Sequence, residues 1–264
     1  MRLVDSHAHL QTDRFAGDVE LVIGGARLAG VERMLVPAWD AASTERALAL
    51  CDRFPWLDAS AGVHPHDAAR VDAAGWARIV ELASDRRVVA IGETGLDFDR
   101  VFSPVKDQLA NLRRNLTLAA ETGKAAILHC RSAAGRRDAQ DALLAELRGV
   151  GGPAAVIVHS FSGPVDYAEA VLDLGAAISF SGLVFRPGEE ASAEVARLVP
   201  AERLLVETDS PFLSPPGAPR RRNQPEWVGV TARWIAEVRG DDPEALGATL
   251  VANYDRILPR ERAR

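Results

Sequence analysis

All six histidines of this chain stand at, or just past, the end of a short apolar run that is typical of a β-strand. They are His7, His9, His64, His66, His129 and His159. Histidine is the commonest metal ligand in proteins and the side chain best suited to proton transfer near neutral pH. Glu93 and Asp209 end two further apolar runs, and their carboxylates can ligate a metal or accept a proton. Together these residue types predict a metallohydrolase site.

The spacing of these residues indicates how metal ions would be held. His7 and His9 are two residues apart, so on an extended strand they point the same way and can bind one ion together. Glu93, with two oxygens, is the natural bridge if two ions lie side by side, and His129 and His159 would complete the second ion. Asp209 would ligate the first ion and take a proton from its bound water.

Each of these residues also has a purely structural interpretation. A lone His-x-His pair is often a surface or core feature, and Glu93 at a strand end can cap a loop. Asp209 precedes Ser-Pro, so it can begin a turn or cap a helix. His129 or His159 alone is typical of a buried imidazole with a hydrogen-bond partner. The joint pattern, with ligand-type residues at the same end of successive strands, favours the site.

Runs rich in Val, Ile and Leu alternate with stretches of helical periodicity along the chain. The expected strands are residues 3–7, 34–38, 58–64, 88–93, 126–130, 155–160, 176–181 and 204–209. The expected helices are residues 17–29, 42–53, 73–84, 105–122, 135–149, 164–174, 190–199, 225–238 and 243–258. This alternation predicts an α/β fold, a single (β/α)8 TIM barrel of residues 1–264. Active sites of such barrels lie at the C-terminal ends of the strands, where these polar residues fall.

Composition limits the classes of function. The chain of 264 residues is 47% hydrophobic and 26% charged, which is ordinary for a globular protein. We expect a cytoplasmic location, because the N-terminal residues lack the pattern of a signal peptide, no apolar stretch has the length of a membrane span, and two cysteines fit a reducing compartment. A net charge of −6 argues against a passive nucleic-acid binder but leaves a phosphate substrate possible. Nothing indicates a membrane or an obligate protein partner.

Six motifs resemble, in order and spacing, those of the TatD family of metal-dependent deoxyribonucleases in the amidohydrolase superfamily. They are DSHAHL, GVHPH, AIGETGLDF, LHCR, VHSFSG and LLVETDSPFL, and the similarity runs from Asp5 to about Asn253. The resemblance implies a first ion held by His7, His9, Glu93 and Asp209, and a second held by Glu93, His129 and His159. It also places His64 in the same site, and it implies divalent ions such as Mg²⁺ and hydrolysis of DNA phosphodiesters, often from the 3′ end.

The chemistry that follows is attack of a metal-activated hydroxide on phosphorus. We expect Asp209, Glu93 and His64 to be the catalytic residues, with Asp209 accepting the proton and His64 or an arginine steadying the phosphoryl oxygens. Two divalent ions, Mg²⁺, Mn²⁺ or Zn²⁺, would serve. The nearest alternative is a carboxylic-ester or amide hydrolase, for example one acting on aminoacyl-tRNA, because related sites act on acyl centres. A more distant alternative is a non-catalytic metal-binding scaffold.

Substrate contacts are expected from loops beyond the strand ends. Asp97 follows Gly95 in the loop expected after the fourth strand and matches the family's GLD motif. Arg131 and the run Arg220 to Arg222 lie where guanidinium groups can hold phosphate oxygens, and Arg222 is taken as the contact of that run. Such a basic run is also typical of a solvated surface. Asp5 and Glu207, two residues before His7 and Asp209, either orient ligand imidazoles or form a buried polar network.

The sequence also departs from the family's usual motifs. Ser132, Ser160 and Gln224 replace the usual Asp, Cys and Glu. None of these changes removes a metal ligand, so they bear on the choice of substrate more than on catalysis.

Overall fold

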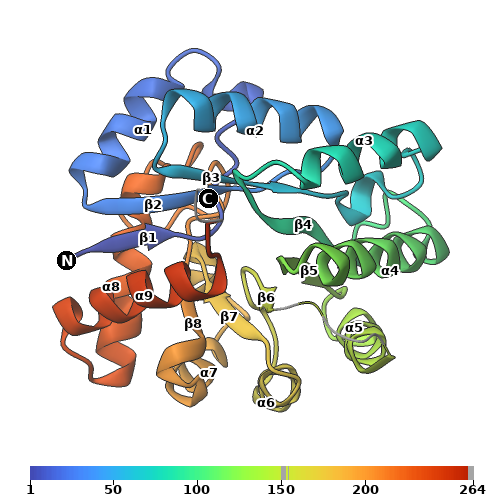
Figure 1. Cartoon of the computed structure of the whole chain (residues 1–264). Coiled ribbons are helices and arrows are strands. Elements are labelled where there is room, and N and C mark those ends of the chain that lie inside the picture. The colour runs from blue at the N-terminus through green and yellow to red at the C-terminus, as the bar shows by residue number, and fades with distance from the viewer. Residues whose placement is uncertain (150–152, 154, 261–264) are drawn as a thin grey trace.

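The computed structural model describes residues 1–149, 153 and 155–260. Within these residues, eight parallel strands follow one another in chain order around a barrel, and helices lie outside them (Figure 1). The strands are β1 (Leu3–Asp5), β2 (Val31–Val36), β3 (Leu57–Ala61), β4 (Val88–Asp97), β5 (Ala125–Arg131), β6 (Val156–Val158), β7 (Ala177–Phe180) and β8 (Leu204–Val206). The predicted TIM barrel is confirmed.

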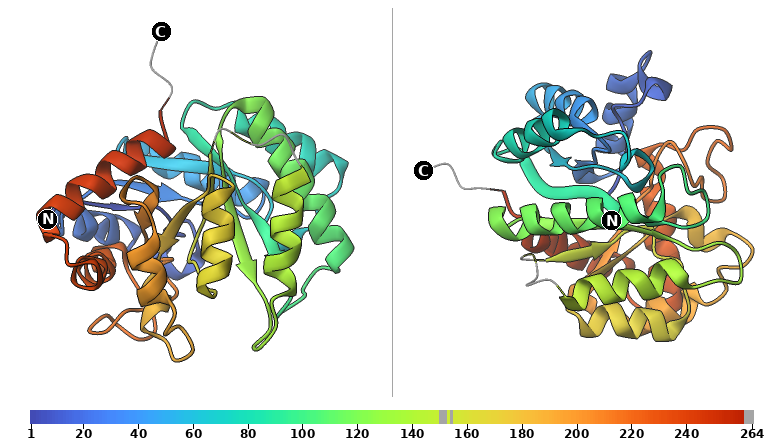
Figure 2. Two further views of the ribbon diagram at one scale, coloured as in Figure 1. Left: turned by 90° about the horizontal axis from the view of Figure 1, so that it is seen from below. Right: turned by 90° about the vertical axis from the view of Figure 1, so that its right-hand side faces the viewer.

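The helices connect successive strands and cover the barrel from outside, as the two views of Figure 2 show. They are α1 (Val19–Leu28), α2 (Ala41–Arg53), α3 (Ala73–Ala83), α4 (Val105–Thr122), α5 (Asp138–Gly149), α6 (Val165–Asp173), α7 (Ser192–Leu198), α8 (Val228–Arg239) and α9 (Pro243–Ile257). Among the described residues, no helix is both long and apolar enough to cross a membrane.

Local sequence explains where the helices begin and end. The Asp40 side chain accepts a hydrogen bond from the backbone N–H of Ser43, and the Ser43 hydroxyl accepts one from the N–H of Asp40, which makes a capping box at α2. Helix α4 ends at Gly123, whose φ of 67° is left-handed. Buried side chains such as Ile79 and Leu112 pack the helices onto the strands. The apolar core therefore lies in the layer between strands and helices.

The barrel closes where β1 meets β8. Ala8 and Ser210 form a parallel bridge just past the ends of these strands. The backbone N–H of Asp209 donates to the carbonyl of His7 at 2.9 Å, and that of His9 donates to the carbonyl of Ser210 at 2.8 Å. We call this junction the seam. It fixes the backbone of His7, His9 and Asp209 relative to one another.

Two boundaries differ from the prediction in a way that matters for the site. Strand β4 continues to Asp97, so Asp97 lies in the barrel wall instead of in a loop. Gly95 permits this, because its φ is +131° and a Cβ there would overlap the carbonyl of His129 on β5. Arg131, expected in a loop, is the last residue of β5.

Candidate metal centre and active site

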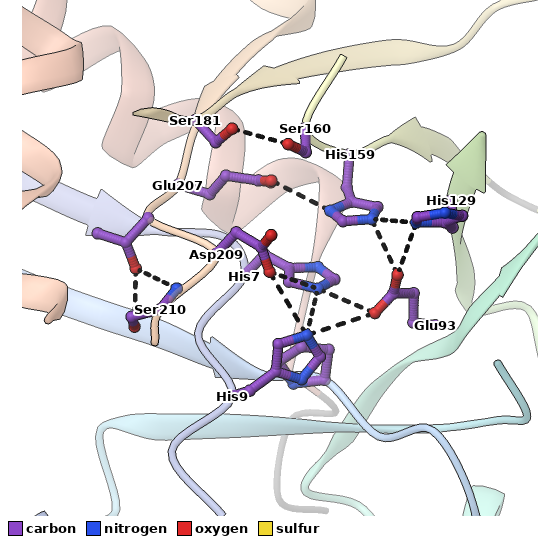
Figure 3. Close-up of polar contacts among 12 residues, drawn as sticks. His7, His9, Glu93, His129, His159, Ser160, Ser181, Glu207, Asp209 and Ser210 are labelled. Atoms are coloured by element: carbon purple, nitrogen blue, oxygen red, sulfur yellow. Dashed lines mark hydrogen bonds and ion pairs between the residues drawn. The ribbon is translucent and has the colours of Figure 1, made fainter. Parts of the chain in front are cut away.

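The predicted ligand residues meet at the C-terminal ends of the strands, as Figure 3 shows. His7 and His9 follow β1, Glu93 and His129 lie in β4 and β5, and His159 and Asp209 follow β6 and β8. The backbone N–H of Glu93 donates to Ala38 at 2.7 Å, and that of His159 donates to Leu128 at 3.1 Å. Neighbouring strand ends therefore hold these residues in place.

The first group of donor atoms surrounds one oxygen of Glu93. Nε2 of His7 lies 3.2 Å from Nε2 of His9 and 3.1 Å from Oε2 of Glu93. Nε2 of His9 lies 3.5 Å from that oxygen and 3.5 Å from Oδ1 of Asp209. Ligands bound at about 2.1 Å to one ion stand about 3 Å apart. These four atoms therefore have the mutual spacing of ligands to a single ion.

The second group surrounds the other oxygen of Glu93. Oε1 lies 3.0 Å from Nε2 of His159 and 3.2 Å from Nδ1 of His129. Nε2 of His64 also lies 3.2 Å from Oε1, a contact that sequence reasoning did not anticipate beyond placing His64 in the site. The two oxygens of one carboxylate thus face two separate sets of imidazoles, which is the arrangement that a bridging ligand requires.

The protonation states of these residues suit metal binding. Burial lowers the pKa of His9 to about 3 and that of His64 to about 4, so both imidazoles are neutral at pH 7. Nδ1 of His64 accepts a hydrogen bond from the backbone N–H of His66 at 3.1 Å. Burial alone would raise the pKa of Glu93, but His159 and His64 hold it well below its ordinary value. Neutral imidazole nitrogens together with the ionised carboxylate of Glu93 are donors that a divalent metal centre uses.

His159 is the exception, because it lies between two carboxylates. Its Nδ1 is 3.1 Å from Oε1 of Glu207, and its Nε2 faces Glu93. Burial disfavours its charged form, but Glu93 and Glu207 raise its pKa well above the ordinary value. A cation bound at Nε2 would replace that proton, since a ligand imidazole must be neutral. Glu207 is therefore placed to orient the ring, as the sequence suggested.

Asp97 lies behind the site instead of facing a substrate. It is fully buried, and its Oδ2 lies 2.7 Å from Nε2 of His66 and 3.4 Å from Nε2 of His129. Its Oδ1 accepts hydrogen bonds from the backbone N–H groups of Asp99 and Arg100. The extension of β4 explains this position, which suits a residue that holds the His129 ring.

Asp5 takes part in a buried polar network, which was the second of the two roles considered for it from the sequence. It is buried and accepts hydrogen bonds from Thr208, through both the backbone N–H and the hydroxyl, and from the backbone N–H of His7. These bonds tie β1 to the segment after β8. Asp5 therefore belongs to a buried polar network at the seam.

A cleft with a volume of about 1240 Å³ opens above the donor atoms. His9, His64, Glu93, His129, His159 and Asp209 lie at its base. Its walls carry seven arginines, Arg14, Arg100, Arg131, Arg136, Arg186, Arg220 and Arg221. In the part of the chain that the structure describes, Arg100, Arg186, Arg220 and Arg221 form no ion pair. A protein of net charge −6 thus concentrates free positive charge around its cleft.

Arg222 does not take the place expected for it. Its guanidinium makes two hydrogen bonds to the carboxylate of Asp18, at 2.8 and 2.7 Å, and lies over the ring of Phe15. It is absent from the lining of the cleft, where Arg220 and Arg221 stand instead. Sequence reasoning also missed Arg14, Arg100 and Arg186, whose only signal was a position in segments that follow strands.

The fold and the site together define a class. A parallel (β/α)8 barrel with histidine and carboxylate donors at the C-terminal ends of its strands is a metal-dependent hydrolase of the TIM-barrel type. The chain belongs to the TatD family, because the family model described as TatD related DNase matches residues 4–259.

Individual relatives extend this result. The "3'-5' ssDNA/RNA exonuclease TatD" of Erwinia billingiae is 37% identical over 264 residues, covering 97% of this chain and 98% of that protein. The "uncharacterized metal-dependent hydrolase YabD" of Bacillus subtilis is 33% identical over 257 residues, covering 97% and 98%. The crystal structure of YJJV, a TatD homologue from Escherichia coli K12, has a TM-score of 0.88 at 29% identity, covering 97% and 98%. The chain thus resembles its relatives along nearly its whole length.

Proposed function

We propose that this protein is an exonuclease that hydrolyses phosphodiester bonds at the 3′ end of single-stranded DNA or RNA, using two divalent ions. The observation that carries the proposal is Glu93, whose two oxygens face two groups of imidazoles at the base of an arginine-lined cleft. The printed names of relatives such as the Erwinia billingiae exonuclease support the substrate class.

The ion sites are assigned to six residues. His7, His9, Glu93 and Asp209 would hold the first ion, and Glu93, His129 and His159 the second. When bound, such ions supply a water that is nucleophilic at neutral pH and neutralise charge on the phosphate. Mg²⁺, Mn²⁺ and Zn²⁺ each suit part of this mixed donor set.

The chain's own residues handle the proton and the phosphate. Asp209 lines the cleft with its Oδ1 3.5 Å from Nε2 of His9, beside the proposed first ion, and would accept the proton of the attacking water. His64 lines the cleft with its Nε2 3.2 Å from Oε1 of Glu93, and we expect it to contact a phosphoryl oxygen. Arg131, also in the lining, would donate to phosphate oxygens.

The proposal includes the organisation and location expected from the sequence. We take residues 1–264 as one domain, of which residues 150–152, 154 and 261–264 lie outside the described structure. Because two cysteines fit a reducing compartment, we place the protein in the cytoplasm, without an obligate protein partner.

The test is turnover by metal-reconstituted protein on 5′-labelled single-stranded DNA, single-stranded RNA, and a carboxylic ester. We expect metal-dependent shortening of the nucleic acids from the 3′ end, which a chelator abolishes and added metal restores. Efficient ester cleavage with every nucleic acid left intact would establish the acyl-hydrolase alternative instead. Metal binding without any turnover would establish the scaffold alternative.

A further inference from the structure

Two aromatic rings in the cleft have no part in the chemistry described so far. Trp39, just after β2, and Phe212, after β8, both line the cleft, and the ring of each contacts that of His9. Their ring centroids lie 5.7 and 6.1 Å from that of His9, with interplanar angles of 61° and 76°. Phe212 is 48% exposed, which is unusual for a phenylalanine beside a buried polar centre.

The backbone holds Phe212 in this exposed position. Leu213 and Asp209 on either side have left-handed φ values of 48° and 52°, which cost free energy in residues other than glycine. The N–H of Phe212 donates to the carbonyl of Asp209 at 2.8 Å, and Asn223 donates to the carbonyls of Pro211 and Leu213. The ring is therefore presented to the cleft by a pinned segment.

Trp39 is fixed in a similar way. The backbone N–H of Trp39 donates to the hydroxyl of Ser43 at 2.9 Å, and its backbone carbonyl accepts a hydrogen bond from the backbone N–H of His64 at 3.0 Å. The guanidinium of Arg46 lies 5.5 Å from its ring centroid. His64, which we expect to contact a phosphoryl oxygen, is thus linked to Trp39 through one backbone hydrogen bond.

Arginines beside Phe212 could bind the phosphate of a nucleotide whose base contacts the ring. The guanidinium of Arg14 lies 5.6 Å from the Phe212 ring centroid and donates to the carbonyl of Arg221. Arg14, Arg220 and Arg221 all line this side of the cleft. An aromatic face next to free guanidinium groups is the pattern that binds an unpaired base together with its phosphate.

We propose that Trp39 and Phe212 form a stacking platform for the unpaired bases at the end of the strand. The inference rests on the proposed exonuclease function and specifies what selects its substrate. Every base has a flat face, so stacking favours single strands with little preference for sequence. In a duplex the faces of each base are already covered by its neighbours, so only an unpaired end gains from the two rings.

The test is a comparison of base and ring removal. Wild type, Phe212→Ala and Trp39→Ala are assayed in metal-loaded form on a short 5′-labelled oligodeoxythymidylate and on the same strand with abasic residues at its 3′ end. Loss of a stacked base raises KM by about 5- to 100-fold. On the normal strand we expect each variant to have a KM higher than wild type by this factor, with little change in kcat. On the abasic strand we expect the variants and wild type to have the same KM.

Two controls separate stacking from damage to the fold. Phe212→Trp keeps a flat ring and should keep the wild-type KM. Phe54→Ala removes a ring that also lies beneath an arginine, Arg53 at 5.5 Å, but stands at the end of α2 outside the cleft lining, so its KM should not change. Thermal unfolding of each variant is recorded to confirm that it is folded.

A binding measurement distinguishes failure of this inference from failure of the proposed function. A 3′-terminal 2-aminopurine strand is titrated with metal-free protein, and quenching of its fluorescence reports stacking without cleavage. Quenching that Phe212→Ala abolishes, in a protein that cuts no strand, would keep the platform and overturn the exonuclease. Cleavage with equal KM on normal and abasic strands would overturn the platform and keep the exonuclease. A protein that neither binds nor cuts the strands would overturn both.

Discussion

At the scale of single residues, Glu93 organises the centre. One oxygen faces His7 and His9, and the other faces His64, His129 and His159. The surrounding imidazoles keep its pKa low, although burial acts in the opposite direction. Without this carboxylate, each half of the proposed centre would lose the anion that balances a cation's charge and that links the two halves.

We expect Glu93→Ala to lose most of both ions, because one side chain serves both positions. Elemental analysis of dialysed protein gives the metal content per chain. Glu189→Ala is the matched control, since Glu189 is another carboxylate in the cleft lining but is bonded to the hydroxyl of Ser162 at 2.7 Å. Equal metal content in wild type and Glu93→Ala would contradict the bridge.

Asp209→Asn separates proton transfer from metal binding. The amide keeps the shape and one ligand oxygen but is not a base, so kcat should fall by about 10²- to 10⁴-fold while the protein stays folded. Metal content is measured on the same sample, because a lost ion would produce the same fall. A fully metallated variant with near wild-type kcat would assign the proton to another group, with His64 as the first candidate.

From the sequence alone we could choose residues that the structure brings together at the strand ends, but we could not assign partners to charged side chains. Residues that follow successive barrel strands must converge, so the pattern of strands alone places His7, Glu93 and Asp209 together. Arg222 shows the limit, because its partner Asp18 lies 204 positions away in the sequence. No local pattern distinguishes a guanidinium already bound to a carboxylate from one left free for phosphate.

At the scale of elements, each strand and each α-helix predicted from periodicity has a counterpart in the structure, and the errors lie at the boundaries of these elements. Helix α5 begins at Asp138 instead of residue 135, and strands β1, β6 and β8 have only three residues each. The larger error, the extension of β4 to Asp97, arose because glycine normally signals a turn. Here Gly95 instead permits close approach to β5, which is a tertiary effect.

One cluster ties β3 to the C-terminal helix at the opposite end from the cleft. Asp58 on β3 is 1% exposed and accepts hydrogen bonds from Arg33 on β2, the hydroxyl of Tyr254 on α9, and Arg260. Arg33 also has a mostly buried side chain, 15% exposed, whereas Arg260 is 40% exposed. The contributions of these two arginines should therefore differ in size.

We expect Asp58→Ala to lower the free energy of unfolding by about 1 to 3 kcal/mol, because Arg33 then keeps, among the described residues, only the exposed Asp255 as a carboxylate partner and the buried hydroxyl of Tyr254 loses its acceptor. Arg260→Ala should cost less than about 1 kcal/mol, since the Arg260 side chain is 40% exposed and Asp58 keeps Arg33 as a partner. Urea denaturation measures both, and kcat of the folded proteins should be unchanged. Equal losses in the two variants would show that burial does not govern this cluster.

At the scale of the whole molecule, the distribution of charge matters more than its sum. The chain carries 31 basic and 37 acidic side chains, yet arginines crowd the walls of one cleft. The excess of acidic groups elsewhere should repel nucleic acid from the rest of the surface. Binding is then directed to the cleft.

Salt should reveal how many of these arginines meet phosphate. We expect log Kd for single-stranded DNA to rise linearly with log salt, and Arg221→Gln to reduce the slope by about 0.7. Arg78→Gln is the control, because Arg78 lies on α3 and is paired with Glu45 and Glu81. Fluorescence anisotropy at several salt concentrations measures the slope. An unchanged slope for Arg221→Gln would remove Arg221 from the phosphate contacts.

The seam has a consequence for how the protein is made. His7 and His9 leave the ribosome early, but their partner Asp209 is added some 200 residues later, as the spacing of 203 residues between the bonded Asp5 and Thr208 illustrates. A growing chain therefore carries three of the four residues proposed for its first ion site, His7, His9 and Glu93, and gains the fourth, Asp209, only after β8 has been added. We expect chains arrested before residue 204 to cleave no nucleic acid, and chains released from the same arrested state to acquire activity as the barrel closes. Nuclease activity would thus be withheld from the messenger and the ribosome until β8 has been synthesised.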